Sequence, residues 1–418
     1  MKIYIFAFIL VLSAACSDRE RSNPLDPQNP SSKGKPGPPV LYSTRDSVYI
    51  SWSHLQFSDA SSFNIYVREE NESDFRLLEK VQPPLFFYWD TGCEYEKNRW
   101  YKISVSSAGF ESVLSDEVQI RPGPTFLWAT DRFRGQVTKY SHDGRYPVLN
   151  VRGFTEPFRI AMDTTENMFW VTDLWDGRLK QMSQRGIVAN ENISLLGMTD
   201  FAFDIGDDVV WATSYNFNAV ARFNVAGLKE LEISTFNSPW YVAVNTDSNK
   251  VFVLNDNSGE IVRMNYEGQI EARKTGFEGF WSMVYDQKRD RLWVGYLDFL
   301  IAVDDALGEM VTSQQISGFT RVAEIAIDFE TGDIWCIDMV EGDGQSRVLK
   351  LSGDGDELLV LPGFSEPWAL AVNHYNHHCF VAEGISGKII ELDAETGIRL
   401  TLNETGGSIA NMVVQTLE

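Results

Sequence analysis

An apolar segment centred on an aromatic residue recurs seven times between residues 125 and 383. The copies read FLWATD, MFWVTD, VVWATS, KVFVLN, RLWVGY, DIWCID and HCFVAE. Their central aromatic residues, called the anchors below, follow one another at intervals of 41 to 45 residues. The anchors are Trp128, Trp170, Trp211, Phe252, Trp293, Trp335 and Phe380. Short apolar runs bounded by Asp, Asn and Gly are typical of buried strands. A period in the forties predicts a ring of four-stranded sheets, that is, a β-propeller.

A second segment, rich in small residues, precedes each anchor from the second onward. The copies read RIAMD, DFAFD, YVAVN, SMVYD, EIAID and ALAVN. The blades of a propeller crowd toward its axis, so small side chains suit the innermost strand. The C-terminal segment SIANMVVQT, residues 408–416, has the same pattern but no anchor after it, whereas Trp128 has no such segment before it. Pairing the two predicts seven blades closed by the C-terminal strand, which leaves no exposed sheet edge.

Residues 38–122 show a different pattern. Short segments in which apolar and polar residues alternate predict strands about ten residues apart, with turn residues between them. This pattern predicts an all-β sandwich. The region resembles a fibronectin type III domain, with Trp52 at its second strand, Tyr66 on the third, and Tyr101 at the start of YKISV. The resemblance implies a spacer or adhesive module, and a tyrosine corner in which the Tyr101 hydroxyl bonds to the backbone.

The N-terminus predicts export and a lipid anchor. Residues 1–15, MKIYIFAFILVLSAA, carry one Lys and then an apolar run that favours a signal peptide. The following Cys16 resembles the lipidated cysteine of bacterial lipoproteins, although Ser13 departs from their usual Leu. Residues 16–37 are polar and Pro-rich, which predicts a flexible tether. Ser17 after the cysteine favours the outer membrane, on its periplasmic or surface side; a plain signal peptide with an incidental cysteine is the alternative.

The net charge of the chain argues against two classes of binding function. Fifty-nine acidic against thirty-six basic residues give a formal net charge of −23. This balance argues against nucleic-acid binding and against an electrostatic hold on an anionic bilayer. The remaining cysteines, Cys93, Cys336 and Cys379, match neither a disulfide framework nor a zinc spacing, so we expect buried thiols.

The loops before the inner strands and after the anchor strands should line one face of the ring. They carry aromatic and charged side chains, and such a concave mouth can hold a sugar, a peptide or a cation. The repeated Gly-Phe and Pro-Trp pairs have a structural alternative as turn and packing devices, so residues unique to one blade are the better candidates. The candidate binding residues are Arg132, Arg134, Asp173, Trp175, Trp240, Trp281, Arg321, Trp368 and Glu383.

The segment HYNHHC places His374, His377 and His378 beside Cys379. In the other repeats this position is a polar hairpin turn on the opposite face, so a solvated turn is predicted there, with adventitious metal binding as the alternative. The sequence predicts no catalytic residue, no metal site and no cofactor.

The repeat resembles NHL-type and virginiamycin B lyase-like propellers. The predicted function is a lipid-anchored binding or scaffolding protein of the bacterial cell envelope, which presents its propeller to an unidentified envelope protein or glycan. The alternative is an enzyme similar to lyase or lactonase propellers, which use a divalent metal at the channel mouth. Here the mouth lacks the histidine of such enzymes, and Glu156, Glu366 and Glu383 are the candidate bases.

Overall fold

The computed structural model describes residues 25–26, 28–29, 32–55, 57, 60–195, 197–204, 206–306, 309–342 and 344–416. Every regular element in these ranges is a β-strand, which confirms the predicted all-β class. The chain divides into two compact units, Met1–Gly123 and Pro124–Glu418. The predicted signal peptide and Cys16 lie outside the described residues.

The first unit holds two antiparallel sheets. One has the order β1 (Val40–Thr44), β2 (Ser47–Ser51) and β5 (Phe87–Thr91). The other has the order β4 (Arg76–Val81), β3 (Ser62–Glu69), β6 (Arg99–Ser107) and β7 (Phe110–Glu111), with β8 (Val118–Ile120) also paired to β6.

The interior of this unit corrects one expectation. Trp52 is fully buried and its ring lies 5.4 Å from that of Phe63. The hydroxyl of Tyr101, however, donates to the carboxylate of Asp90 at 2.6 Å, so the predicted bond to the backbone is wrong. Asp90 is buried on β5, and Arg99 lies 3.3 Å from it. A charged carboxylate is a stronger acceptor than a carbonyl, so Tyr101 instead links the two sheets.

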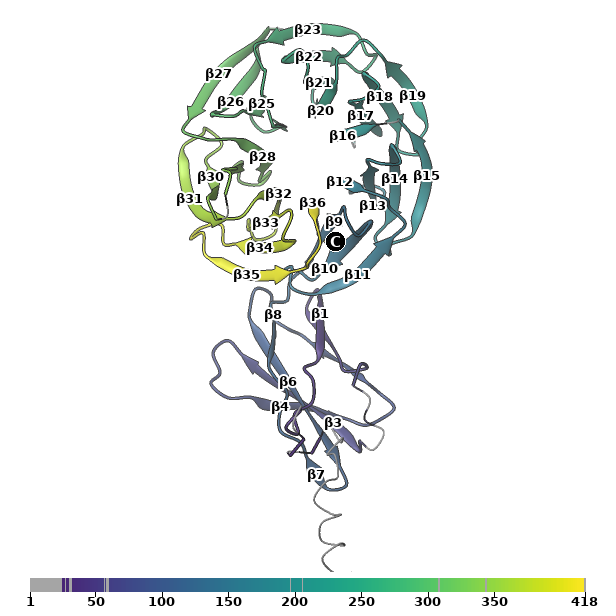
Figure 1. Cartoon of the computed structure of the whole chain (residues 1–418), viewed down its shortest axis with the longest axis vertical. Helices are drawn as coiled ribbons and strands as arrows, with labels where there is room; N and C mark the ends of the chain where they lie inside the picture. The colour runs from purple at the N-terminus through teal and green to yellow at the C-terminus, as the bar shows by residue number, and fades with distance from the viewer. Residues whose placement is uncertain are drawn as a thin grey trace, which may run out of the picture. The chain divides into compact units, whose positions relative to one another are not determined.

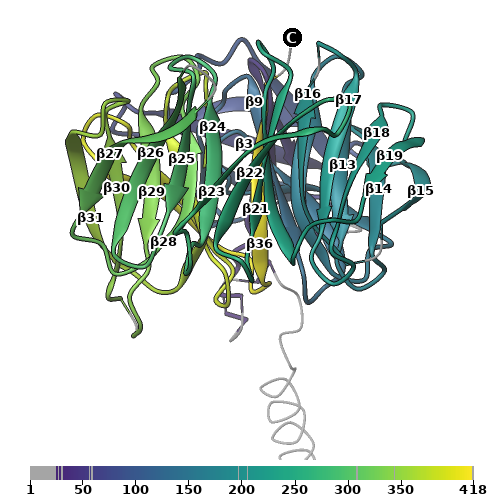
Figure 2. The same cartoon turned by 90° about the horizontal axis from the view of Figure 1, so that it is seen from above.

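The second unit contains seven four-stranded antiparallel sheets within its described residues, arranged around a central axis in a propeller-like manner (Figures 1 and 2). Six sheets follow chain order from the innermost strand outward. They are β12 (Pro157–Asp163), β13 (Met168–Asp173), β14 (Arg178–Ser183) and β15 (Val188–Ser194); β16 (Met198–Asp204), β17 (Val209–Ser214), β18 (Ala219–Asn224) and β19 (Lys229–Ile233); β20 (Pro239–Asn245), β21 (Lys250–Asn255), β22 (Glu260–Asn265) and β23 (Ile270–Thr275); β24 (Ser282–Asp286), β25 (Arg291–Gly295), β26 (Phe299–Ala306) and β27 (Glu309–Ser317); β28 (Val322–Ile327), β29 (Ile334–Asp338), β30 (Ser346–Leu351) and β31 (Glu357–Phe364); β32 (Pro367–Val372), β33 (Cys379–Glu383), β34 (Lys388–Leu392) and β35 (Arg399–Glu404).

The remaining sheet joins the two ends of this unit. Its order is β36 (Ile409–Thr416), β9 (Thr125–Asp131), β10 (Gln136–Tyr140) and β11 (Pro147–Arg152). The predicted pairing of the C-terminal strand with the strand of Trp128 is therefore confirmed, and Val413 lies opposite Trp128. The indole N–H of Trp128 also donates to the side-chain oxygen of Gln415 at 2.8 Å.

The innermost strands contact one another in a closed circle, in the order β12, β16, β20, β24, β28, β32 and β36, with β36 returning to β12. The anchors lie on the second strand of every sheet, and each is at most 1% exposed. Burial of such large rings between neighbouring sheets stabilises this unit. The innermost strands surround the axis, where the candidate site lies.

Candidate functional site

A cavity of about 480 Å³ lies at the axis of the second unit. The residues that line it come from the innermost strands β12, β20, β28, β32 and β36 and from the adjoining loops. They are Arg132, Phe158, Arg159, Trp240, Tyr241, Asp256, Phe280, Trp281, Arg321, Ala323, Glu324, Met339, Trp368 and Ala410. Since each of its charged residues occurs in one sheet alone, the repeat builds an asymmetric cavity of a size typical for small-molecule sites.

Aromatic rings form much of the wall. Trp240 packs edge-on against Tyr215, with ring centroids 5.0 Å apart. Trp368 lies over Gly384, where a Cβ atom would come within 2.4 Å of the indole ring. Trp281 is 41% exposed, so much of its ring surface stays open to a ligand. The wall therefore combines fixed aromatic rings with one that presents a free surface.

A largely buried charge cluster contributes to the lining of the cavity. The guanidinium of Arg159 on β12 lies 3.1 Å from the carboxylate of Glu324 on β28 and 3.4 Å from that of Asp200 on β16. On the shorter way round the circle, β36 and β32 separate β12 from β28. Arg159 therefore reaches across the axis, and its guanidinium also lies 5.5 Å from the ring centroid of Tyr241.

Burial and ion pairing shift the pKa values of this cluster in opposite directions. It raises the pKa of Asp200 to about 6, although Arg159 and the N–H of Val242 work in the opposite direction. Burial alone lowers the pKa of Arg159, but Glu324 and Asp200 outweigh it and raise that pKa above its ordinary value. The guanidinium thus stays charged, and Asp200 takes up a proton under mildly acidic conditions.

The other two arginines of the cavity differ from each other. Arg132 forms an ion pair with Glu156, with Nε 3.0 Å from the carboxylate oxygen. Arg321 has no carboxylate within ion-pair distance among the residues that the structure describes. Its guanidinium lies 4.4 Å from the ring centroid of Trp281, and its Nε is buried without a hydrogen-bond partner.

The structure brings together five of the nine candidate residues. Those that line the cavity are Arg132, Trp240, Trp281, Arg321 and Trp368. The other four, Arg134, Asp173, Trp175 and Glu383, are not among its lining residues. Trp175 is 79% exposed, and Arg134 donates to the carbonyl oxygens of Thr405 and Gly406.

The two remaining carboxylates, at the ends of anchor strands, hold the backbone. Buried Asp173 accepts the backbone N–H groups of Thr155 and Glu156 and contacts the ammonium of Lys180 at 2.9 Å. Buried Glu383 likewise accepts the N–H of Ser365. Asp338 does the same for Thr320 and Arg321 in its own sheet. A carboxylate at this position therefore fixes the loop that leads into the inner strand, as a cap fixes a helix end.

Sequence reasoning missed the charge cluster. Arg159, Asp200 and Glu324 occupy the first position of the inner-strand segments RIAMD, DFAFD and EIAID. The signal was present, because a charged residue at the first position stands out in segments whose next three residues are small or apolar. Among the candidate bases, Glu156 pairs with Arg132, Glu383 is buried, and Glu366 is not among the cavity-lining residues.

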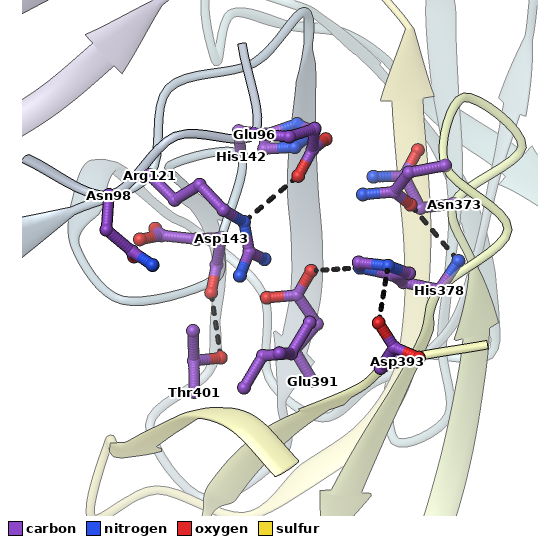
Figure 3. A network of polar contacts seen from close by, with 12 residues as sticks. Glu96, Asn98, Arg121, His142, Asp143, Asn373, His378, Glu391, Asp393 and Thr401 are labelled. Atoms are coloured by element: carbon purple, nitrogen blue, oxygen red, sulfur yellow. Dashed lines mark hydrogen bonds and ion pairs between the residues drawn. The ribbon is translucent and has the colours of Figure 1, made fainter. Parts of the chain in front are cut away.

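The histidine-rich segment forms the hairpin turn between β32 and β33, as predicted, but its side chains are paired with acids. His377 Nδ1 lies 2.8 Å from Asp328, and His378 Nδ1 lies 2.9 Å from Glu391. Figure 3 shows His378 between Glu391 and Asp393. Within the described ranges, no group of three or more His, Cys, Asp or Glu residues is arranged to hold a metal ion.

Cys93, Cys336 and Cys379 are buried, as expected, and burial raises the pKa of Cys93 to about 11. Cys336 and Cys379 also have thiol pKa values raised by burial. In the portion of the chain that is described, no helix has the length and apolar character needed to cross a membrane.

No known protein family matches this chain, and no curated protein does. Among solved structures, a functionally unknown protein from Desulfotomaculum acetoxidans aligns at 10% identity with a TM-score of 0.59, covering 70% of this chain and 99% of its own. Hydrazine synthase from Kuenenia stuttgartiensis aligns at 12% identity with a TM-score of 0.50, covering 57% of this chain and 76% of its own. Apo AztD from Citrobacter koseri aligns at 10% identity with a TM-score of 0.46, covering 70% and 97%. At these identities the likeness concerns the fold alone, and this chain shares a β-rich fold with distant proteins.

Proposed function

We propose that this chain is a non-catalytic binding protein of the bacterial cell envelope, anchored by a lipid at Cys16. In this proposal the second unit is a seven-bladed β-propeller closed by the C-terminal strand. The first unit is a fibronectin type III-like domain that serves as a spacer. The pairing of β36 with β9 and the closed circle of inner strands support the first assignment. The two sheets and the buried Trp52 support the second.

The observation that carries the proposal is the cavity at the axis. It has the volume of a small-molecule site, six of its fourteen lining residues are aromatic, and its charged lining residues, Arg132, Arg159, Asp256, Arg321 and Glu324, each occur in no other repeat at the same position. A purely structural ring needs no such asymmetry. The geometry therefore supports recognition of one ligand, or of one projecting side chain or sugar of a partner, at the mouth.

The anchor is tested by expressing the full chain and its Cys16→Ser variant. We expect the parent to partition into membranes and carry the mass of a diacylglycerol and an acyl chain, because several acyl chains together give stable anchoring. The variant should be released as an unlipidated protein. Equal partitioning of both would contradict the anchor but would leave the binding site untouched.

Binding is tested with the released Cys16→Ser chain, screened against glycans, peptides and small organic molecules. The affinity of ligands that bind in the cavity should fall at least tenfold in Trp281→Ala, because the indole ring supplies exposed stacking surface. Trp175→Ala is the matched control, since Trp175 is exposed outside the cavity. If every ligand found in the screen binds Trp281→Ala with the same affinity as the parent chain, the proposed site is overturned.

A further inference from the structure

Resting on the proposed binding function, we infer the class of ligand: a single carboxylate on an apolar, ring-sized body, with Arg321 as the residue that binds the carboxylate. The inference begins from the three arginines that line the cavity. Arg159 is neutralised by Asp200 and Glu324, and Arg132 is paired with Glu156. Arg321 is the cavity-lining arginine that no carboxylate of the described residues compensates.

The surroundings of Arg321 leave its hydrogen-bonding edge open. Its guanidinium stacks over Trp281 at 4.4 Å from the ring centroid, and Nη1 lies 3.8 Å from the sulfur of Met339. Stacking engages the face of the guanidinium and leaves its in-plane N–H groups directed elsewhere. The Nε atom is buried, so a ligand in the cavity reaches the terminal N–H groups of the guanidinium, which lines the cavity. A carboxylate suits these groups best, because its two oxygens match two parallel N–H donors of the planar fork.

The backbone of Arg321 is held in place independently of any ligand. Its N–H donates at 3.0 Å to Asp338, and that carboxylate also forms an ion pair with Arg347. Asp338 therefore serves the loop and Arg347, while the Arg321 side chain remains for the cavity. A donor fixed before binding gains affinity because less conformational entropy is lost when the ligand arrives.

Charge and volume limit the rest of the ligand. Asp256 and Glu324 also line the cavity, and the whole chain carries a net charge of −23. Both disfavour a polyanion, so one carboxylate is expected rather than several. The open ring of Trp281 and the neighbouring Phe280 and Trp240 suit an apolar or aromatic body. The cavity of about 480 Å³ admits a body of one or two rings.

The test uses matched acids and amides on the released Cys16→Ser chain. The pairs are phenylacetate with phenylacetamide, 3-phenylpropanoate with 3-phenylpropanamide, and indole-3-acetate with indole-3-acetamide. Ligand-observed NMR titration gives each dissociation constant. We expect at least one acid to bind tenfold or more tightly than its amide. Arg321→Gln should remove this preference, and Arg321→Lys should keep part of it, because a point charge replaces the fork.

Arg134→Gln is the matched control, since Arg134 lies outside the cavity lining and contacts only backbone carbonyls and Asp131 among the described residues. Thermal unfolding of all variants establishes that each is folded. If acids and amides bind equally, and both weaken in Trp281→Ala, the inference is overturned while the proposed binding function stands. If no aromatic acid binds, the inference is also overturned, and the proposed function falls with it only when glycans and peptides fail at the mouth too.

Discussion

Asp200 lies in an environment unlike that of an ordinary, solvated aspartate. It is buried at the axis, and burial raises its pKa to about 6 against the attraction of Arg159. In the unfolded chain the carboxyl titrates near its normal value of about 4. Between these two pH values the folded protein holds a proton that the unfolded chain has lost. The contribution of Asp200 to the free energy of unfolding therefore falls as the pH rises from about 4 to about 6.

We predict that Asp200→Asn removes this dependence. The difference in unfolding free energy between parent and variant should shift in favour of the variant between pH 4.5 and pH 6.5, by on the order of 2 kcal/mol. Urea unfolding at a series of pH values measures it. Asp247→Asn, in an exposed hairpin turn, is the control and should show no such trend. A parallel pH profile for parent and Asp200→Asn would contradict the assigned environment.

Asp173 and Trp175 were both candidate binding residues, yet the structure gives them opposite surroundings. Removing the Asp173 carboxylate leaves the Lys180 ammonium buried without that partner and frees two backbone N–H groups. Asp173→Ala should cost about 3–5 kcal/mol of stability, as for other broken buried pairs. Trp175→Ala should change it by less than about 0.5 kcal/mol, because the side chain is exposed. Equal effects in chemical denaturation would refute the proposed backbone role of Asp173.

Contacts between individual side chains were the least predictable feature of this protein. The sequence analysis named Asp173 as a candidate binding residue, but nothing in the pattern showed that backbone N–H groups would occupy its carboxylate oxygens. Arg159 and Glu324 belong to segments recognised for their small residues, and these segments lie far apart along the chain. Their contact depends on a side chain that crosses the axis, which no period in the sequence encodes.

At the scale of elements, β36 carries the closure of the second unit. It lies between β9 in its own sheet and the inner strands β12 and β32 of the two neighbouring sheets. The side chain of Asn411 accepts the N–H of Ile160 on β12 at 3.1 Å. Removing this strand exposes the edge of β9 and opens the circle of inner strands, so the loss should spread beyond one sheet.

We predict that deleting residues 407–418 abolishes cooperative thermal unfolding of the second unit. Deleting residues 17–28, an equally long part of the predicted tether, should leave the transition unchanged. A milder variant is Gln415→Ala, which leaves the buried indole N–H of Trp128 without its partner and should cost about 1–3 kcal/mol. Gln184→Ala, on the exposed surface, is its control. A truncated chain with the parental melting temperature would contradict the role of β36.

Element order was the most predictable level of this protein. The anchors, the inner segments and the unpaired C-terminal segment together predicted which strands pair, because buried aromatic rings and crowded inner strands leave a strong periodic pattern. The prediction for the first unit was less complete. Its strands were anticipated, but the hydroxyl of Tyr101 donates to Asp90 instead of bonding to the backbone. Local strand patterns do not show which buried acceptor from the other sheet comes closest.

At the scale of the whole molecule, the proposed arrangement of lipid, tether, spacer and propeller would hold a binding head away from the membrane surface. The net charge of −23 on the whole chain fits this proposal, because an acidic protein is not drawn onto an anionic bilayer and would depend on the proposed lipid for attachment. The function of the molecule then rests on the asymmetric cavity at the axis. The surrounding sheets supply a rigid frame that is common to many activities.

The most direct test of this account is a crystallographic fragment screen of the released Cys16→Ser chain. The account predicts that bound fragments gather in the axial cavity, with rings against Trp281 and polar groups at Arg321. Fragments distributed over other surfaces, with the cavity filled by its own side chains, would contradict it.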